Sequence, residues 1–277
     1  SSDVCSSDLT VMALAACGGP TYYEKFRSLI NLLPEGQYNT NREYISVDTY
    51  GFICPFSRKF YEEFGSPRKP KDPITGIRYV ICDITNRSEV VKHVTDVAKN
   101  GLDILINNAG IGATGDVTQA TDEEWHKVLD VNIVGTARMS AAAIPFLKNS
   151  SNAAIVNVSS IVATDGFPQR AVYSASKGGV HSLTLAMAAD HIHDKIRVNC
   201  VVPATADTPW VGRLLENSDD PKATQAALIA RQPMGRLVTA TEIAHAICYL
   251  ASPLSGSTTG TALNVDGGVG GLRVPPK

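Results

Sequence analysis

From residue 77 onward, short apolar runs alternate with segments of helical spacing, and this alternation constrains the fold more than any other feature of the sequence. The apolar runs predict strands over 79–84, 102–106, 154–158, 197–202 and 261–265. The helical spacing covers 86–100, 121–147, 173–191 and 241–250. Because the apolar runs are continuous, we expect both faces of each strand to be buried. The pattern predicts an α/β fold with a doubly wound parallel sheet.

The size and composition of the chain fit a single domain. It has 277 residues, of which 44% are apolar and 19% charged, enough for one sizeable core. The formal net charge of −2 gives no strong field for nucleic acid or an anionic membrane, so we expect neither as a partner. No apolar run approaches the ~18 residues that a membrane span needs. The six cysteines lack zinc-like spacing, which predicts free thiols, no metal site and a cytoplasmic location.

Residues 1–76 do not share the pattern of the rest. The first nine, SSDVCSSDL, resemble the translation of a sequencing adapter. The apolar stretch 9–17 lacks the basic residues that precede such a stretch in a secretion signal. Two clusters that follow it, 22–33 and 56–64, could form amphipathic helices, and prolines at 34, 55, 67, 70 and 73 break the sequence between and after them. We therefore expect an atypical or artefactual N-terminal segment over 1–76 and an α/β domain over 77–277.

Tyr173 and Lys177 form the sharpest local signal. They are four residues apart near the start of a predicted helix, so they share one face. A free tyrosine titrates near pH ~10, and a nearby ammonium favours its phenolate, which suits the pair to proton exchange near neutrality. Ser160 ends the preceding strand, where its hydroxyl is placed to hydrogen-bond a substrate oxygen. Such pairs also occur by chance on solvated helices. The interpretation as a proton-exchange site therefore depends largely on the preceding strand that ends in Ser-Ser.

Several motifs together make residues 77–268 resemble the short-chain dehydrogenase/reductase family. They are NNAG at 107–110, LDVNIVG around Asn132, IVNVSS ending at Ser160, YSASK from Tyr173 to Lys177, RVNCVVP at 197–203 and NVDGG at 264–268. The resemblance implies a Rossmann-like catalytic domain, with residues 1–76 in place of its first strand–helix–strand unit. It also implies NAD or NADP as cofactor and hydride transfer between a secondary alcohol and a ketone.

The resemblance further implies a role for each site residue. Tyr173 would exchange a proton with the substrate oxygen, while Lys177 would hold the nicotinamide ribose and lower the pKa of the tyrosine. Ser160 would orient the carbonyl, and Asn132 would support a proton-relay water. The implied cofactor contacts are Asp83, Ile84, Asn108, Ala109, Gly110, Ala206 and Thr208, together with Tyr173 and Lys177. Each residue also has a structural alternative, such as Asp83 capping a helix.

Three features depart from the family pattern. The glycine-rich loop TGxxxGxG has no counterpart, because the glycines before residue 77 stand at 18, 19, 36, 51, 65 and 76, and no two are two or four apart. Such a loop brings backbone amides to the pyrophosphate, so its loss predicts weak cofactor binding. No residue that selects NAD or NADP can be located, and Pro203 is followed by Ala204 where the family has glycine. We interpret the G-x-G-x-x-G pattern at 110–115 as a loop beside the site.

Two arginines bear on the substrate. Arg170 precedes Tyr173 by three residues, and Arg231 lies in the segment that forms a substrate lid in the family. Both stand where the type-2 hydroxybutyrate dehydrogenase branch places carboxylate-binding arginines, and a guanidinium fork suits a carboxylate. The resemblance therefore implies a hydroxy acid or a sugar acid as the small-molecule substrate. The alternative is that both arginines form salt bridges on the lid.

Two functions stay open at this point. One is an NAD(P)-dependent oxidoreductase, favoured by Asn132, Ser160, Tyr173 and Lys177 occurring together. The other is a non-catalytic relative, or a chimeric chain with impaired cofactor binding, favoured by the missing glycine loop. The family assembles as dimers or tetramers through two long helices, here 121–147 and 173–191. Small residues on the second helix permit close contact, so we expect a homo-oligomer; they are Ala186, Ala188 and Ala189.

Overall fold

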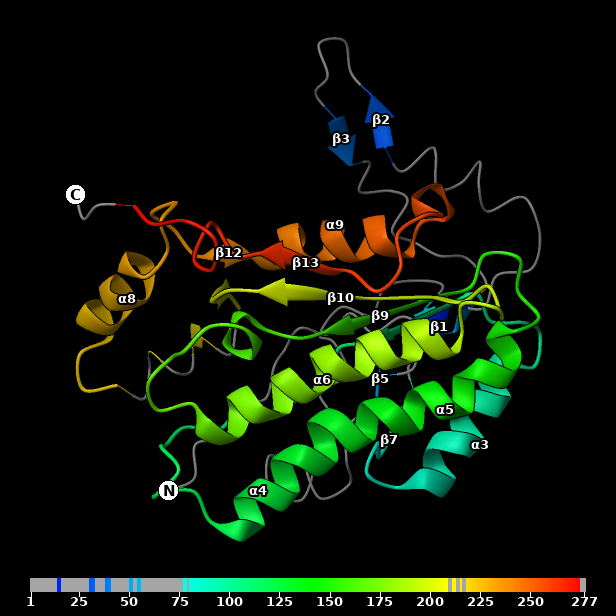
Figure 1. Ribbon diagram of the computed structural model, residues 1–277, viewed down its shortest axis with the longest axis horizontal. Helices are drawn as coiled ribbons and strands as arrows, with labels where there is room; N and C mark the ends of the chain where they lie inside the picture. Colours follow the sequence, from blue (N-terminus) through cyan, green and yellow to red (C-terminus); the bar gives the residue numbers. More distant parts are fainter. Residues whose placement is uncertain are drawn as a thin grey trace.

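The structure is a computed structural model that describes residues 14–15, 30–32, 38–40, 50–51, 54–55, 77–78, 80–208, 211–212, 215 and 218–274. Its centre is a five-stranded sheet in the order β1-β8-β9-β10-β13 (Figure 1). Four strands run parallel, namely β8 (Ile104–Asn107), β9 (Ala154–Val158), β10 (Arg197–Pro203) and β13 (Ala262–Val265). They confirm the parallel sheet expected from the continuous apolar runs.

An antiparallel strand, β1 (Leu14–Ala15), lies on the side of β8 that faces away from β9. Leu14 pairs with Leu105 and Ala15 pairs with Ile104. The carboxyl end of β1 therefore lies beside the amino end of β8, at the edge opposite the carboxyl ends of the parallel strands. In a doubly wound sheet this position beside a middle strand normally belongs to the first parallel strand.

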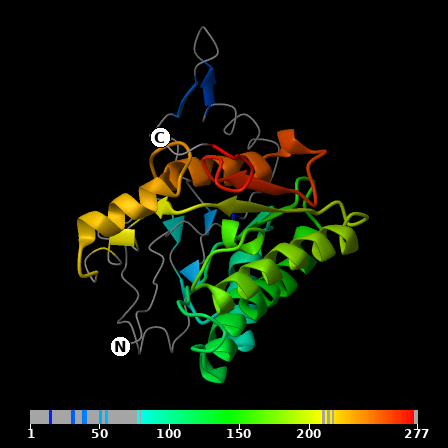
Figure 2. The ribbon, with the colours of Figure 1, turned by 60° about the vertical axis from the view of Figure 1, so that its left-hand side comes forward.

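Helices cover both faces of the sheet (Figures 1 and 2). One face carries α3 (Arg87–Ala98), α4 (Asp122–Leu129), α5 (Gly135–Leu147) and α6 (Ala171–Asp190), and the other carries α9 (Ala240–Ala251). α8 (Pro221–Ala230) lies beyond the carboxyl end of β10, on the left of Figure 1. No helix in the described part of the chain is both long and apolar enough to cross a membrane.

Short elements complete the described chain. β11 (Ala206–Asp207) pairs in parallel with β12 (Val238–Thr239). The other two-stranded pairs are β2 (Ile30–Leu32) with β3 (Tyr38–Thr40), β4 (Tyr50–Gly51) with β6 (Ile77–Arg78), and β5 (Cys54–Pro55) with β7 (Ile81–Cys82). The helical turns are η2 (Asp130–Val134), η3 (Ile161–Ala163) and η4 (Pro253–Ser255).

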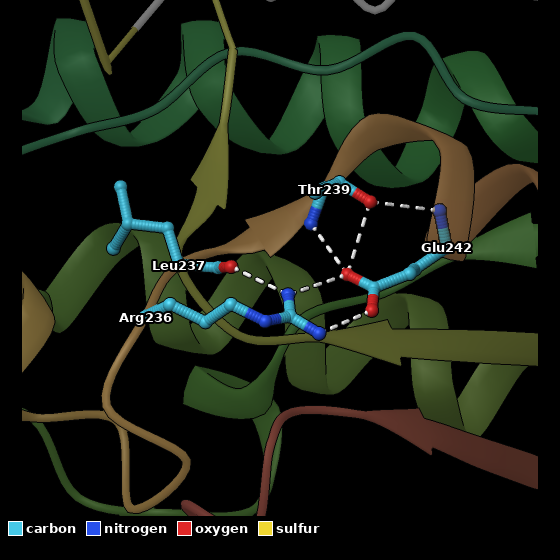
Figure 3. A network of polar contacts seen from close by, with 4 residues as sticks. All are labelled: Arg236, Leu237, Thr239 and Glu242. Atoms are coloured by element: carbon cyan, nitrogen blue, oxygen red, sulfur yellow. Dashed lines mark hydrogen bonds and ion pairs between the residues drawn. The ribbon is translucent and has the colours of Figure 1, made fainter.

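Side-chain caps set where the helices begin. Thr121 accepts a hydrogen bond from the amide of Glu124 at 3.2 Å and so caps the start of α4. Thr239 and Glu242 form a reciprocal capping box at the start of α9 (Figure 3). Arg236 clamps the same carboxylate through two nitrogens, at 2.9 and 2.6 Å. The hydrogen bonding from Arg236 is the main cause that lowers the pKa of Glu242 to about 2, and the backbone hydrogen bond from Thr239 adds to it.

The core divides into layers on the two faces of the sheet. Leu105, Ile155 and Val198 point to the side of α3, α5 and α6 and pack with Val94 and Leu147. Their neighbours in the strands point the other way and pack against Ile243 and Leu250 of α9; these strand residues are Ile104, Ile106, Val156, Val158 and Val201. Burial on both faces explains why these strands read as unbroken apolar runs.

Asparagines inside the sheet are structural. The side-chain amide of Asn107 donates to Asn157 at 2.9 Å and to Ser140 at 3.0 Å. Asn157 in turn donates to Thr184 of α6 at 2.9 Å. These bonds satisfy polar groups that would be costly to bury unpaired, and they fix α5 and α6 against the sheet.

Two sequence expectations need correction. The predicted strand 79–84 shortens to β7, which pairs with β5 and does not join the main sheet, because β1 already lies beside β8. Ala188, expected at a helix surface open to a partner, is 6% exposed and belongs to the core beside Val198. Ala186 and Ala189 are exposed as expected.

Candidate active site

Lys177 is buried one turn after Tyr173 on α6. Its side-chain amine donates to the carbonyl oxygen of Val158 at 2.9 Å and lies 5.8 Å from the centroid of the Tyr173 ring. Burial lowers the pKa of Lys177 to about 8, because the low-dielectric surroundings disfavour its charged form. The amine therefore keeps its proton at pH 7 and places a positive charge beside the phenol.

Asn132 lies in the π-helical turn η2 that joins α4 to α5, and its side chain is fully engaged within the protein. Its amide nitrogen donates to the carbonyl of Ile111 and to the hydroxyl of Ser176, both at 2.9 Å. Its amide oxygen accepts from the backbone nitrogen of Ile111 at 2.8 Å. The side chain of Asn132 thereby ties the loop after β8 to the start of α6.

Ser176 is a site residue that the sequence analysis missed. Its hydroxyl accepts from Asn132 and donates to the carbonyl of Tyr173 at 2.8 Å. The signal was available, because residues three apart on a helix share a face and Ser176 follows Tyr173 at that spacing. Ser176 and Asn132 together support the turn of α6 that carries Tyr173.

Gly110 lies where the loop after β8 passes Lys177. A methyl group added at Gly110 would lie 3.2 Å from the amide oxygen of Asn132 and 3.3 Å from the amine of Lys177. The missing side chain therefore keeps open a cradle beside the lysine amine. The preceding residues are placed as expected at the end of β8, with Asn108 9% exposed and Ala109 packed on the core.

Ser160 follows β9 and begins η3. Its hydroxyl oxygen faces the backbone nitrogen of Val162 at 3.4 Å, a long contact. Ser159, beside it, is buried and donates to the carbonyl of Lys177 at 3.0 Å, which anchors the end of β9 to α6. This agrees with a structural role for Ser159 and leaves Ser160 at the carboxyl edge of the sheet.

Asp83 and Ile84, two of the implied cofactor contacts, follow β7 and make side-chain contacts within the protein. One carboxylate oxygen of Asp83 accepts from the backbone nitrogen and the hydroxyl of Thr85, at 2.8 and 2.6 Å. Ile84 is 2% exposed and packs against Gly135 of α5. The helix that follows is capped by Asn86, so Asp83 is not its cap.

The remaining expected residues lie beyond β10. Ala206 is in β11 and packs with the cluster under α9. Thr208 is 8% exposed, and its carbonyl accepts from the backbone nitrogen of Gly212 at 3.0 Å. Both follow the carboxyl end of β10, the same edge of the sheet as the start of α6 (Figure 1).

The two arginines differ in their surroundings. Arg170 donates to the hydroxyl of Thr114 at 2.6 Å and to the carbonyl of Ala113 at 3.3 Å. No described carboxylate forms an ion pair with Arg170, so the salt-bridge alternative has no support among the residues described. Arg231 ends α8 and is exposed.

Comparisons with known proteins agree with this architecture. A family model described as enoyl-(acyl carrier protein) reductase matches residues 69–270. Dehydrogenase/reductase SDR family member 6 of Danio rerio is 35% identical over 205 residues, covering 74% of this chain and 83% of that relative. A 2-(S)-hydroxypropyl-CoM dehydrogenase of Xanthobacter autotrophicus is 35% identical over 190 residues, covering 68% of this chain and 74% of that relative.

Solved structures show the same likeness. The ligand-free aldohexose dehydrogenase of Thermoplasma acidophilum has a TM-score of 0.72 and 29% identity, covering 83% of this chain and 98% of that one. A variant of actinorhodin polyketide ketoreductase with NADPH has a TM-score of 0.67 and 30% identity, covering 72% of this chain and 79% of that one. Fold and relatives define a nicotinamide-dependent oxidoreductase. The chain belongs to the short-chain dehydrogenase/reductase family.

Proposed function

We propose that the chain interconverts a secondary alcohol and a ketone, with Tyr173 exchanging a proton with the substrate oxygen. The observation that carries this proposal is the buried amine of Lys177, held 5.8 Å from the Tyr173 ring centroid. Since the pKa of Lys177 falls only to about 8, the amine is charged near neutrality and favours the phenolate. A phenol whose pKa is lowered in this way is an effective acid and base in the neutral range.

Ser160 and Asn132 take different parts in the proposal. The hydroxyl of Ser160 would orient the substrate oxygen from the end of β9. Both hydrogens of the Asn132 side-chain amide are donated inside the protein, so that side chain acts as a positioning group for Ile111 and α6. A proton-relay water would be held by the main-chain carbonyl of Asn132, which also accepts from Thr136 at 2.8 Å.

The cofactor in this proposal is NAD or NADP, which supplies or accepts a hydride at the nicotinamide ring when bound. The cradle at Gly110 supports the fit of the nicotinamide-ribose half, because it opens directly onto the amine of Lys177. Tyr173, Asn108 and Ala109 would line the same half. Ala206 and Thr208 would approach the nicotinamide carboxamide.

For the substrate we propose a hydroxy acid or a sugar acid. The guanidinium of Arg170 is held by neutral oxygens, which steady it without neutralising its charge. Arg231 is exposed, so its charge is available to an anion. A guanidinium binds a carboxylate through two parallel hydrogen bonds, which suits recognition of an acid over a neutral alcohol.

Gln232 carries a buried side-chain acceptor next to Arg231 in the sequence. It follows Arg231 directly and is 4% exposed. Its amide oxygen is the one buried side-chain nitrogen or oxygen among the described residues that has no hydrogen-bond partner. A buried acceptor of this kind gains a partner when a donor such as a substrate hydroxyl reaches it.

The substrate proposal is tested with Arg170→Met and Arg231→Met, singly and together. We expect the double variant to lose about tenfold or more in kcat/KM for hydroxy acids and sugar acids, because each charge-assisted hydrogen bond contributes about 1.5–3 kcal/mol. Activity on neutral secondary alcohols should change little. The exposed Arg273→Met serves as the matched control. An unchanged preference for acids would end the substrate proposal, and absence of turnover on every alcohol despite NADH binding would favour a non-catalytic relative.

We also propose that the chain forms a homo-oligomer through the surface of α4, α5 and α6. Leu185 of α6 is 47% exposed and lies in the same helix as the exposed Ala186 and Ala189, and Val134 of η2, between α4 and α5, is 38% exposed. Apolar side chains on one surface favour burial against a second copy. Light scattering on the purified chain should give the mass of a dimer or tetramer, and a monomeric mass at micromolar concentration would refute the proposal.

A further inference from the structure

The two halves of the candidate cofactor site are built unequally. The nicotinamide end has the buried amine of Lys177, the ring of Tyr173 in the preceding turn of α6 and a cradle at Gly110. At the opposite end, which would hold the pyrophosphate and adenosine, the described residues do not show the glycine turn and helix N-terminus that a doubly wound sheet uses there. Resting on the function proposed above, this contrast bears on which part of the cofactor the chain recognises.

An antiparallel strand occupies the sheet position beside β8. Parallel strands hold a pyrophosphate with a glycine turn and a helix N-terminus at their carboxyl ends. Here that position belongs to β1, whose carboxyl end faces the opposite edge of the sheet. The sequence agrees, because no two glycines before residue 77 have the spacing that the turn requires.

The glycine pattern at 110–115 does not replace the missing turn. The backbone nitrogen of Ile111 already donates to Asn132 at 2.8 Å. The backbone nitrogen of Gly115 donates to the carbonyl of Gln169 at 3.1 Å. Two of the amides that a phosphate would need are therefore committed to holding the loop in place.

The side chains of Asp83 and Ile84, which the family resemblance implies as cofactor contacts, make contacts within the protein. The side chain of Ile84 packs against Gly135 in the core. One oxygen of the Asp83 carboxylate accepts two hydrogen bonds from Thr85.

From this contrast we infer that the chain recognises the nicotinamide mononucleotide half of the cofactor as its unit of binding. The adenosine half adds little free energy in this inference, since the described residues offer its pyrophosphate no preorganised row of amides and the sequence before residue 77 lacks the glycine spacing. Reduced nicotinamide mononucleotide, NADH and NADPH should then bind with similar affinity, and the 2′-phosphate of NADPH should be neither favoured nor rejected.

The test uses the full chain and compares dissociation constants by quenching of protein fluorescence. We expect reduced nicotinamide mononucleotide to bind no more than about tenfold more weakly than NADH, and ADP-ribose not to displace it. Saturation-transfer NMR of bound NADH should show transfer to the nicotinamide protons and little to the adenine protons. Lys177→Met should weaken both ligands equally, whereas Lys92→Met on the exposed face of α3 should leave both unchanged.

The outcomes separate this inference from the proposed function. If NADH binds more than about tenfold more tightly than the mononucleotide, or if ADP-ribose displaces it, the adenosine half is held and the inference is overturned while the proposed function stands. If none of the nicotinamide ligands binds, both the inference and the proposed function are wrong. An equal loss of affinity for the mononucleotide and for NADH in Lys177→Met would support both the inference and the proposed function.

Discussion

Replacing Tyr173 with phenylalanine should reduce kcat by about 10²–10⁴-fold, the usual contribution of a positioned proton donor or acceptor. The ring should stay in place, because it packs beside Val128 and Val172 and its main-chain carbonyl, not its hydroxyl, accepts from Ser176. Steady-state kinetics on a secondary alcohol, together with a fluorescence titration with NADH, measures both effects. We expect turnover to fall while the dissociation constant of NADH changes by less than about tenfold.

The matched control is Tyr249→Phe, which removes a hydroxyl from a residue that is 54% exposed on α9. Its kcat should equal that of the unmodified chain. A Tyr173→Phe variant with undiminished kcat would show that proton exchange occurs elsewhere and would remove the basis of the proposed function.

Replacing Lys177 with methionine should change how the stability of the fold depends on pH. The unfolded chain keeps the proton of this lysine up to its ordinary pKa of 10.5, whereas burial lowers the folded-state pKa to about 8. Between these values the unfolded state binds more protons, so the folded state gains stability as the pH rises. Relative to Lys177→Met, the unmodified chain should gain about 3 kcal/mol in unfolding free energy between pH 7 and pH 11.

Urea denaturation at a series of pH values measures this difference, and it cancels the pH-independent loss of the bond to Val158. Lys92→Met, an exposed position on α3, should give a curve parallel to that of the unmodified chain. Parallel curves for Lys177→Met as well would mean that the lysine is not desolvated in the folded protein, which contradicts the electrostatic argument for Tyr173.

Much of the fold could be predicted because burial leaves a direct mark on the sequence. β9 occupies the predicted range 154–158, and α6 begins two residues before the predicted 173. Strands buried on both faces read as unbroken apolar runs, and capping threonines mark helix starts. The position of β1 had no such mark, because two residues of pairing are too short to create a pattern and the direction of pairing depends on the whole sheet.

The candidate site was predictable in part. Tyr173 and Lys177 share a helical face, so their proximity followed from spacing alone. The contacts of Ile84 and the network of Asn132 did not, because they depend on which helix packs against which strand. The same holds for Asn107, whose bond to Asn157 crosses between neighbouring strands.

The π-helical turn at Asp130–Val134 amounts to one surplus residue in an otherwise continuous rod from Asp122 to Leu147. Each residue of an α-helix advances the chain by about 100° around the axis, so inserting a residue into the regular helix at the start of α5, where no such turn absorbs it, would swing everything downstream by roughly a quarter of a revolution. The face of α5 that carries Met139 and Ala143 would then leave the core. The wide turn therefore lets one helical rod place Asn132 against the loop after β8 while the apolar face of α5 stays on the core.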